Sequence, residues 1–135
     1  MRRFIKSAIL ASALVISQSA SAAPPPSGIL VGEITVSLHF MTTCYIVFDI
    51  DGNSADITLA GGDPLSCDPL VQISSPVSIT VSDDKVTFNG LTLWIGSYSC
   101  TDDLDADWNG ATLTIDSAYM EGDLYDCFID ATASY

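Results

Sequence analysis

The strongest constraint on the fold is a strict alternation of apolar and polar residues. Between residues 33 and 40, the side chains of Ile34, Val36, Leu38 and Phe40 alternate with polar ones. Successive side chains of a β-strand point to opposite faces, so this period of two predicts a strand with one face in the core and one in water. The alternation recurs along the chain and no segment has the helical period, which predicts an all-β protein.

The predicted strands are short and are separated by turn signals. Asp51-Gly52 and Asn89-Gly90 each predict a hairpin turn, because glycine readily adopts positive φ. About eight or nine short strands are most simply arranged as a two-sheet antiparallel β-sandwich. A transmembrane barrel is the alternative, but its strands need about 9–11 residues, and most of these are shorter. The predicted strands cover residues 33–40, 44–48, 57–60, 70–73, 78–82, 85–88, 91–95, 111–116 and 125–133.

The N-terminus has the composition of a secretory signal peptide. A basic start and a short apolar run precede a cleavage site of small residues, Ala20-Ser21-Ala22. The apolar run is shorter than the ~20 residues that span a bilayer. We expect residues 1–22 to be the signal peptide, residues 23–30 a proline-rich mobile leader and residues 31–135 a single all-β domain. The protein would then be secreted and bacterial, either extracellular or periplasmic, with no transmembrane segment.

The charge of the chain is strongly negative. Seventeen Asp and Glu residues stand against four Lys and Arg, and three of those four lie in residues 1–22. Beyond residue 22, Lys85 is the only basic residue, so the formal charge there is one minus seventeen, or −16. An acidic protein of this kind cannot neutralise phosphate groups, so nucleic acid and anionic membranes are poor partners. The charge instead favours solubility.

Four cysteines behind a signal peptide predict two disulfides rather than metal ligands or a nucleophilic thiol. The sequence contains no CxxC motif, and its single histidine, His39, falls on the polar side of a predicted strand. We expect the pairs Cys44–Cys67 and Cys100–Cys127, because each closes a loop of moderate length. The sequence alone leaves all three connectivities open.

Residues 102–107 form the most acidic segment, which we interpret as a turn. Asp103, Asp105 and Asp107 have the spacing of the first, third and fifth ligands of an EF-hand loop. The sixth position is Trp108 instead of Gly and the twelfth is Thr114 instead of Glu, so the segment is not an EF-hand. We expect no cofactor, with a looser calcium site at the three aspartates as the alternative. Repulsion among these carboxylates predicts that calcium raises thermal stability, although sodium could do the same by screening.

The order of elements in the second half of the chain resembles one family. The alternating segment SITVSDDKVTFNG is followed by Cys100, by the run WNGATLT from Trp108, and by Cys127 at the start of the last predicted strand. With the earlier Cys44 and Cys67, this order resembles the small secreted bacterial proteins known as protein activators of alkane oxidation. The resemblance implies a secreted β-rich accessory protein that helps cells to use or emulsify insoluble alkanes. It implies no active-site residue.

The sequence offers no convincing catalytic residues. The acidic residues lack a flanking Arg or His, and no GxSxG motif accompanies His39. We therefore expect a non-enzymatic secreted accessory or surface-active protein whose partner is a hydrophobic compound or a cell surface. The alternative is an extracellular adhesin, matrix or pilin-like module that self-assembles by strand pairing. The aromatic residues could pack in the core or form an exposed apolar face; they are Trp94, Tyr98, Trp108, Tyr119 and Tyr125.

Overall fold

The computed structural model describes residues 23–38, 40–62, 67 and 71–135. The expected signal peptide and His39 lie outside these residues. In the described part of the chain, no helix has the length and apolarity needed to cross a membrane. The described residues form antiparallel strands: β4 (Gly28–Ser37), β5 (Met41–Asp51), β6 (Ser54–Gly62), β7 (Val71–Ile73), β8 (Val77–Ser82), β9 (Lys85–Ile95), β10 (Tyr98–Trp108), β11 (Thr112–Gly122) and β12 (Cys127–Ser134).

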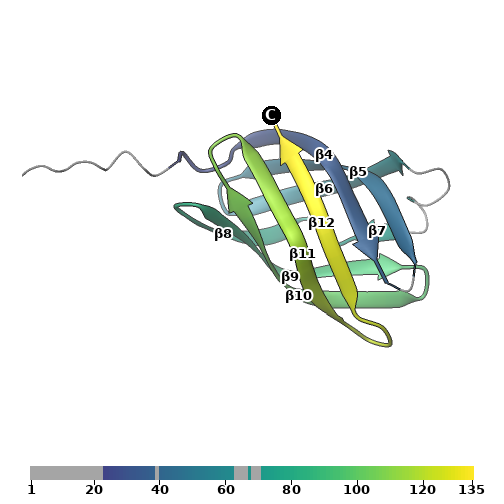
Figure 1. Ribbon diagram of the computed structural model, residues 1–135. Helices are drawn as coiled ribbons and strands as arrows, with labels where there is room; N and C mark the ends of the chain where they lie inside the picture. Colours follow the sequence, from purple (N-terminus) through teal and green to yellow (C-terminus); the bar gives the residue numbers. More distant parts are fainter. Residues whose placement is uncertain (1–22, 39, 63–66, 68–70) are drawn as a thin grey trace, which may run out of the picture.

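These strands belong to one sheet that closes on itself (Figure 1). The order around the sheet is β10-β11-β12-β4-β5-β6-β8-β9, and β9 pairs with β10 to complete an eight-stranded barrel. The short strand β7 pairs with the far end of β9, beyond β8. The prediction of an all-β antiparallel fold is confirmed, but two separate sheets are not formed. The reason is the long β9–β10 ladder, which runs from Tyr98↔Ile95 to Asp107↔Lys85 and joins the two layers.

The acidic segment at residues 102–107 lies within a strand and not in a turn. In β10, the buried side chains of Leu104 and Ala106 alternate with the exposed Asp103, Asp105 and Asp107. The alternation was visible in the sequence, but Asp is depleted in strands, and this made a turn the simpler interpretation.

The second predicted hairpin turn is also wrong. Asn89 and Gly90 lie inside β9, where they bulge out between the Asp102↔Leu91 and Leu104↔Phe88 pairs. Gly90 has φ +63°, the positive value that suggested a turn, but a β-bulge uses the same conformation. The two predicted strands at this position therefore merge into one of 11 residues. At this length, β9 is long enough to take part in a closed barrel.

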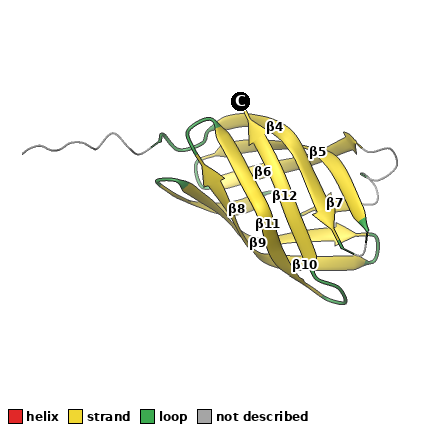
Figure 2. Cartoon of the chain, viewed as in Figure 1, coloured by secondary structure: helices red, strands yellow, loops and turns green. Residues whose placement is uncertain are grey.

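The inside of the barrel is filled by the inward side chains of every long strand. The rings of Phe48 and Phe88 lie with their centroids 5.4 Å apart in this core. Gly32 in β4 allows the backbone of β12 to approach closely, because the carbonyl of Thr132 occupies the place that a Cβ would take. The hairpin turns of the described chain lie at the two ends of the barrel (Figure 2), whereas residues 74–76 bend within its wall, where the backbone amide of Ser74 donates to the carbonyl of Thr92 at 2.9 Å. At one of these ends, Gly52 and Asn53 form the predicted hairpin turn between β5 and β6.

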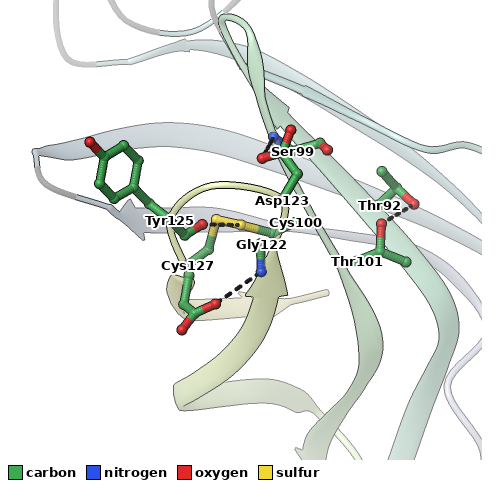
Figure 3. The surroundings of a disulfide bond; sticks show 9 residues. Thr92, Ser99, Cys100, Thr101, Gly122, Asp123, Tyr125 and Cys127 are labelled. Carbon is green, nitrogen blue, oxygen red and sulfur yellow. Dashed lines mark hydrogen bonds between the residues drawn. A yellow bond between two sulfur atoms is a disulfide. The ribbon is translucent and has the colours of Figure 1, made fainter.

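The described residues contain two disulfides, Cys44–Cys67 and Cys100–Cys127, which are the pairs expected from the sequence. Cys100 lies near the start of β10 and Cys127 opens β12, so this bond joins the two strands that flank β11 (Figure 3). The loop beside it is held to β10 by the backbone amide of Ser99, which donates to Asp123 Oδ1 at 3.1 Å. Because the barrel strands are antiparallel, Cys44 near the start of β5 lies at the same end.

The barrel begins before the expected boundary at residue 31. Strand β4 starts at Gly28, and the preceding residues 23–27 are hydrogen-bonded to the barrel at Trp108 and Tyr135.

Candidate functional site

The acidic side chains of β10 are engaged by donors on the neighbouring strand β9. Asp105 Oδ1 accepts a hydrogen bond from the Thr87 hydroxyl at 2.7 Å, and Asp103 Oδ1 accepts one from the backbone amide of Gly90 at 2.7 Å. Asp107 forms an ion pair with Lys85, with the Nζ and Oδ1 atoms 3.4 Å apart. Each carboxylate thus stabilises the β9–β10 ladder that closes the barrel.

This arrangement bears on the calcium site considered from the sequence. The three aspartates are directed at three separate donors along β9. Among the described residues, no group of three or more His, Cys, Asp or Glu side chains converges in a way that could hold a metal ion. The structure therefore gives the predicted residues a cross-strand role and does not bring them together as ligands.

A row of exposed apolar side chains crosses the barrel on another side. The register of four adjacent strands, β11, β12, β4 and β5, places Tyr119 opposite Phe128, Phe128 opposite Ser37 and Ser37 opposite Met41. The exposed fractions of Tyr119, Phe128 and Met41 are 50%, 47% and 73%. With adjacent strands about 4.8 Å apart, the row is about 15 Å long. We call Tyr119, Phe128, Ser37 and Met41 the aromatic row, after the two rings at one end of it.

Other large apolar side chains are exposed on the same four strands or on the loops that join them. Of the eleven exposed large apolar residues in the described part of the chain, nine belong to this region; Trp94 lies in β9, and Tyr135 follows the end of β12 and packs against Trp108. We call the outward surface of β11, β12, β4 and β5 the apolar face. The same strands also expose six acidic residues, so the face is mixed in character: Glu33, Asp49, Asp51, Asp116, Glu121 and Asp130. The nine residues are Ile29, Val31, Phe40, Met41, Tyr45, Tyr119, Leu124, Tyr125 and Phe128.

The electrostatic environment of the aromatic row is negative. The rings of Tyr119 and Phe128 meet edge to face, with centroids 5.9 Å apart. Partial desolvation raises the pKa of the Tyr119 phenol above its ordinary value, and a hydrogen bond to the Asp126 side chain adds to this effect. The negative charges of Asp126, Glu121 and Asp102 raise the pKa further. Tyr119 therefore stays neutral and presents an apolar ring with an uncharged hydroxyl.

The aromatic residues singled out from the sequence have different positions. Trp108 is buried, whereas Trp94, Tyr119 and Tyr125 are exposed. Tyr98 packs edge to face against Tyr125, with centroids 5.3 Å apart. Sequence reasoning missed the other members of the exposed set, above all Phe128 and Met41. For Phe128 a signal existed, because in the predicted strand 125–133 it alternates with the apolar Cys127 and Ile129, which places it on the opposite face.

The hollows on the surface are shallow. One of about 340 Å³ lies between Ile57–Leu59 of β6 and Val71–Ile73 of β7, and another of about 180 Å³ lies beside Trp108 and Asp107. The second hollow is also lined by Asp84, Thr112 and Thr114. Comparisons with protein family models, with curated proteins and with solved structures give no match, so the site is interpreted from its own geometry.

Proposed function

We propose that the protein is a non-enzymatic secreted accessory protein that contacts hydrophobic matter through its apolar face. One observation carries the proposal: of the eleven large apolar side chains that are exposed among the described residues, nine lie on one side of the barrel. Apolar surface in contact with water costs about 25 cal/mol per Å², so an apolar contact stabilises such a face. The resemblance to protein activators of alkane oxidation supports insoluble alkane as the matter contacted.

The rest of the surface supports the same function. The β9 and β10 side of the barrel carries Asp103, Asp105 and Asp107, each exposed to water. Like charge on neighbouring molecules keeps them apart in solution. The large apolar side chains gather on one side of the barrel while acidic residues are exposed on both sides, so the protein can adsorb at an oil–water interface through its rings and still carry charge that keeps it soluble.

The direct test is the interfacial tension of a hexadecane drop in a solution of the protein. We expect the native protein to lower the tension, and the Tyr119→Ser, Phe128→Ser double variant to lower it much less. Trp94→Ser is the matched control, because it removes an exposed aromatic side chain outside the apolar face. Equal loss in the control and the double variant would contradict the proposal. In the source organism, deletion of the gene should slow growth on hexadecane and leave growth on glucose unchanged.

A second candidate, a structural module that self-assembles by strand pairing, is favoured by the seam between β6 and β7. Strand β6 pairs with β8 only at Ser54 and Ala55. Beyond these residues, the described parts of β6 and β7 face each other across the 340 Å³ hollow without a pairing ladder. Unpaired strand edges can accept a strand from another molecule. Size-exclusion chromatography separates the candidates, because polymers that grow with concentration favour self-assembly and a monomer favours the accessory protein.

A further inference from the structure

The proline-rich residues 23–27 lie against the end of the barrel where β10 turns into β11. The indole Nε1 of Trp108 donates a hydrogen bond to the carbonyl oxygen of Pro24 at 2.7 Å. The backbone amide of Ser27 donates to the hydroxyl oxygen of Tyr135 at 3.1 Å. The first bond joins residues that are 84 positions apart in the sequence, and the second joins residues that are 108 positions apart. The segment is therefore docked on the folded barrel.

The surface under this segment is aromatic. The rings of Trp108 and Tyr135 meet edge to face with centroids 6.0 Å apart. Trp108 has only 3% of its surface exposed, and Pro26 is buried. Gly110 supplies the close approach, because a Cβ at this position would lie 3.3 Å from the Ala23 Cβ atom. Its φ of +96° also disfavours other residues.

The covalent structure of the segment suits this surface. Each proline ring fixes φ near −65°, and each residue before a proline is held in an extended conformation. Three consecutive prolines therefore favour the polyproline II helix, which has no internal hydrogen bonds and leaves its carbonyl groups free to accept from outside donors. Grooves that recognise such helices are lined by aromatic rings. Here the ring of Trp108 supplies the apolar surface and its N–H group supplies the donor.

We propose that Trp108, Gly110 and Tyr135 form a binding site for a proline-rich segment in the polyproline II conformation, and that residues 23–27 of the same chain are its resident ligand. Because the segment is tethered to β4, its effective concentration at the site is on the order of millimolar. In the structure the segment occupies the site. A second proline-rich segment binds only after the resident one has left.

The test uses Trp108 as a fluorescent reporter. The chain has two tryptophans, so Trp94→Phe leaves Trp108 alone. In this background, replacing Pro24, Pro25 and Pro26 by glycine should release the segment and raise acrylamide quenching of Trp108 several-fold. Adding the free peptide Ala-Pro-Pro-Pro-Ser at millimolar concentration should then restore the protection. The peptide Ala-Gly-Gly-Gly-Ser should not.

A second variant removes one hydrogen bond without changing the segment. Tyr135→Phe deletes the hydroxyl that accepts from Ser27, and we expect a smaller rise in Trp108 quenching with an unchanged circular dichroism spectrum. This variant also decides the matter if the glycine variant loses its sheet structure. Unchanged quenching in the folded variants, failure of the proline peptide to protect, or equal protection by the glycine peptide would each overturn the proposal.

Discussion

The barrel has two sides that share one core but differ in the kind of side chain that they direct outward. On the β8, β9 and β10 side, polar groups pair across the strands. The Asn89 amide donates to the Thr80 hydroxyl at 3.0 Å, and the hydroxyls of Thr92 and Thr101 lie 3.0 Å apart. We call this side the polar face. On the apolar face, large rings and methyl groups stand at outward positions beside cross-strand polar pairs such as Thr35 and Thr43, whose hydroxyls lie 3.0 Å apart. The two faces of the described barrel therefore differ in their large exposed apolar side chains, which gather on the apolar face and are represented on the polar face by Trp94.

The difference also explains how an acidic strand can close a barrel. Asp residues are poor strand formers, and like charges beside one another are destabilising. In β10, however, Asp105 and Asp107 each lie directly opposite a donor on β9, namely Thr87 and Lys85. Cross-strand partners therefore offset the low strand propensity of these residues, and the charge remains exposed to water.

The pairing of β4 with β12, which builds the apolar face, can be disrupted by adding a single methyl group. In Gly32→Ala, the new Cβ meets the carbonyl of Thr132, so β12 has to move away from β4. We expect the free energy of unfolding to fall by about 3 kcal/mol or more, measured by urea denaturation. Gly61→Ala in β6 is the control, because a Cβ there has no neighbour within 4 Å, and its effect should stay within about 0.5 kcal/mol. Equal effects would show that β4 and β12 are not closely paired.

The second prediction concerns the covalent link between the two faces. The Cys100–Cys127 bond joins β10 of the polar face to β12 of the apolar face and closes a loop of sequence separation 27. Replacing both cysteines by alanine should cost about 3–4 kcal/mol of stability in the chain-entropy description. Thermal denaturation of the double variant measures the loss. A loss below about 1 kcal/mol would mean that the two faces are held together by packing alone.

The third prediction separates a calcium effect from screening on the polar face. Asp103, Asp105 and Asp107 are directed at separate donors, so we expect calcium and sodium chloride at matched ionic strength to raise the melting temperature equally. The corresponding gain in the free energy of unfolding should be at most about 1 kcal/mol. The melts are compared with one in EDTA. A rise specific to calcium that disappears in the Asp105→Asn, Asp107→Asn double variant would contradict this expectation and restore the calcium site.

The smallest effect is the ionisation of Tyr119 on the apolar face. Its pKa is raised in the folded protein, so the neutral phenol is favoured there. Its contribution to stability is therefore complete below the ordinary tyrosine pKa of about 10 and is lost as pH rises through the raised value. Asp126→Asn removes the hydrogen-bonded charge and should lower the Tyr119 pKa. A spectrophotometric titration of phenolate absorbance, with Tyr119→Phe to assign the signal, measures the shift. An unchanged titration would remove Asp126 as a cause.

The inward half of the structure was readable from the sequence, because alternation assigns a residue to the core without knowledge of its neighbours. Ile34 and Val36 were placed correctly on this basis. Closure of the barrel was not readable. It depends on the pairing of β9 with β10, and the sequence signals at Gly90 and Asp103 are equally compatible with turns. Whether a positive φ produces a turn or a bulge is decided by the strand that lies opposite.

The candidate site was predicted only in part, for a related reason. The aromatic row consists of residues from four strands, and its members come together through register. Tyr119 was singled out as an aromatic residue, but nothing in its local sequence shows that it lies opposite Phe128. The three aspartates of β10 are the opposite case. Their closeness in sequence suggested that they share a ligand, but each one is bonded to a different residue of β9.

The position of the disulfides has a consequence for local unfolding. Both bonds lie at the end that contains the β9–β10 and β11–β12 turns. At the opposite end, residues 23–27 and the β10–β11 turn are held by hydrogen bonds such as the one from Trp108 to Pro24. Local opening should therefore start at the end without covalent links, where backbone amides would exchange with deuterium fastest. The crosslinked end would keep its strands in register during such an opening and so guide the frayed ends back into place.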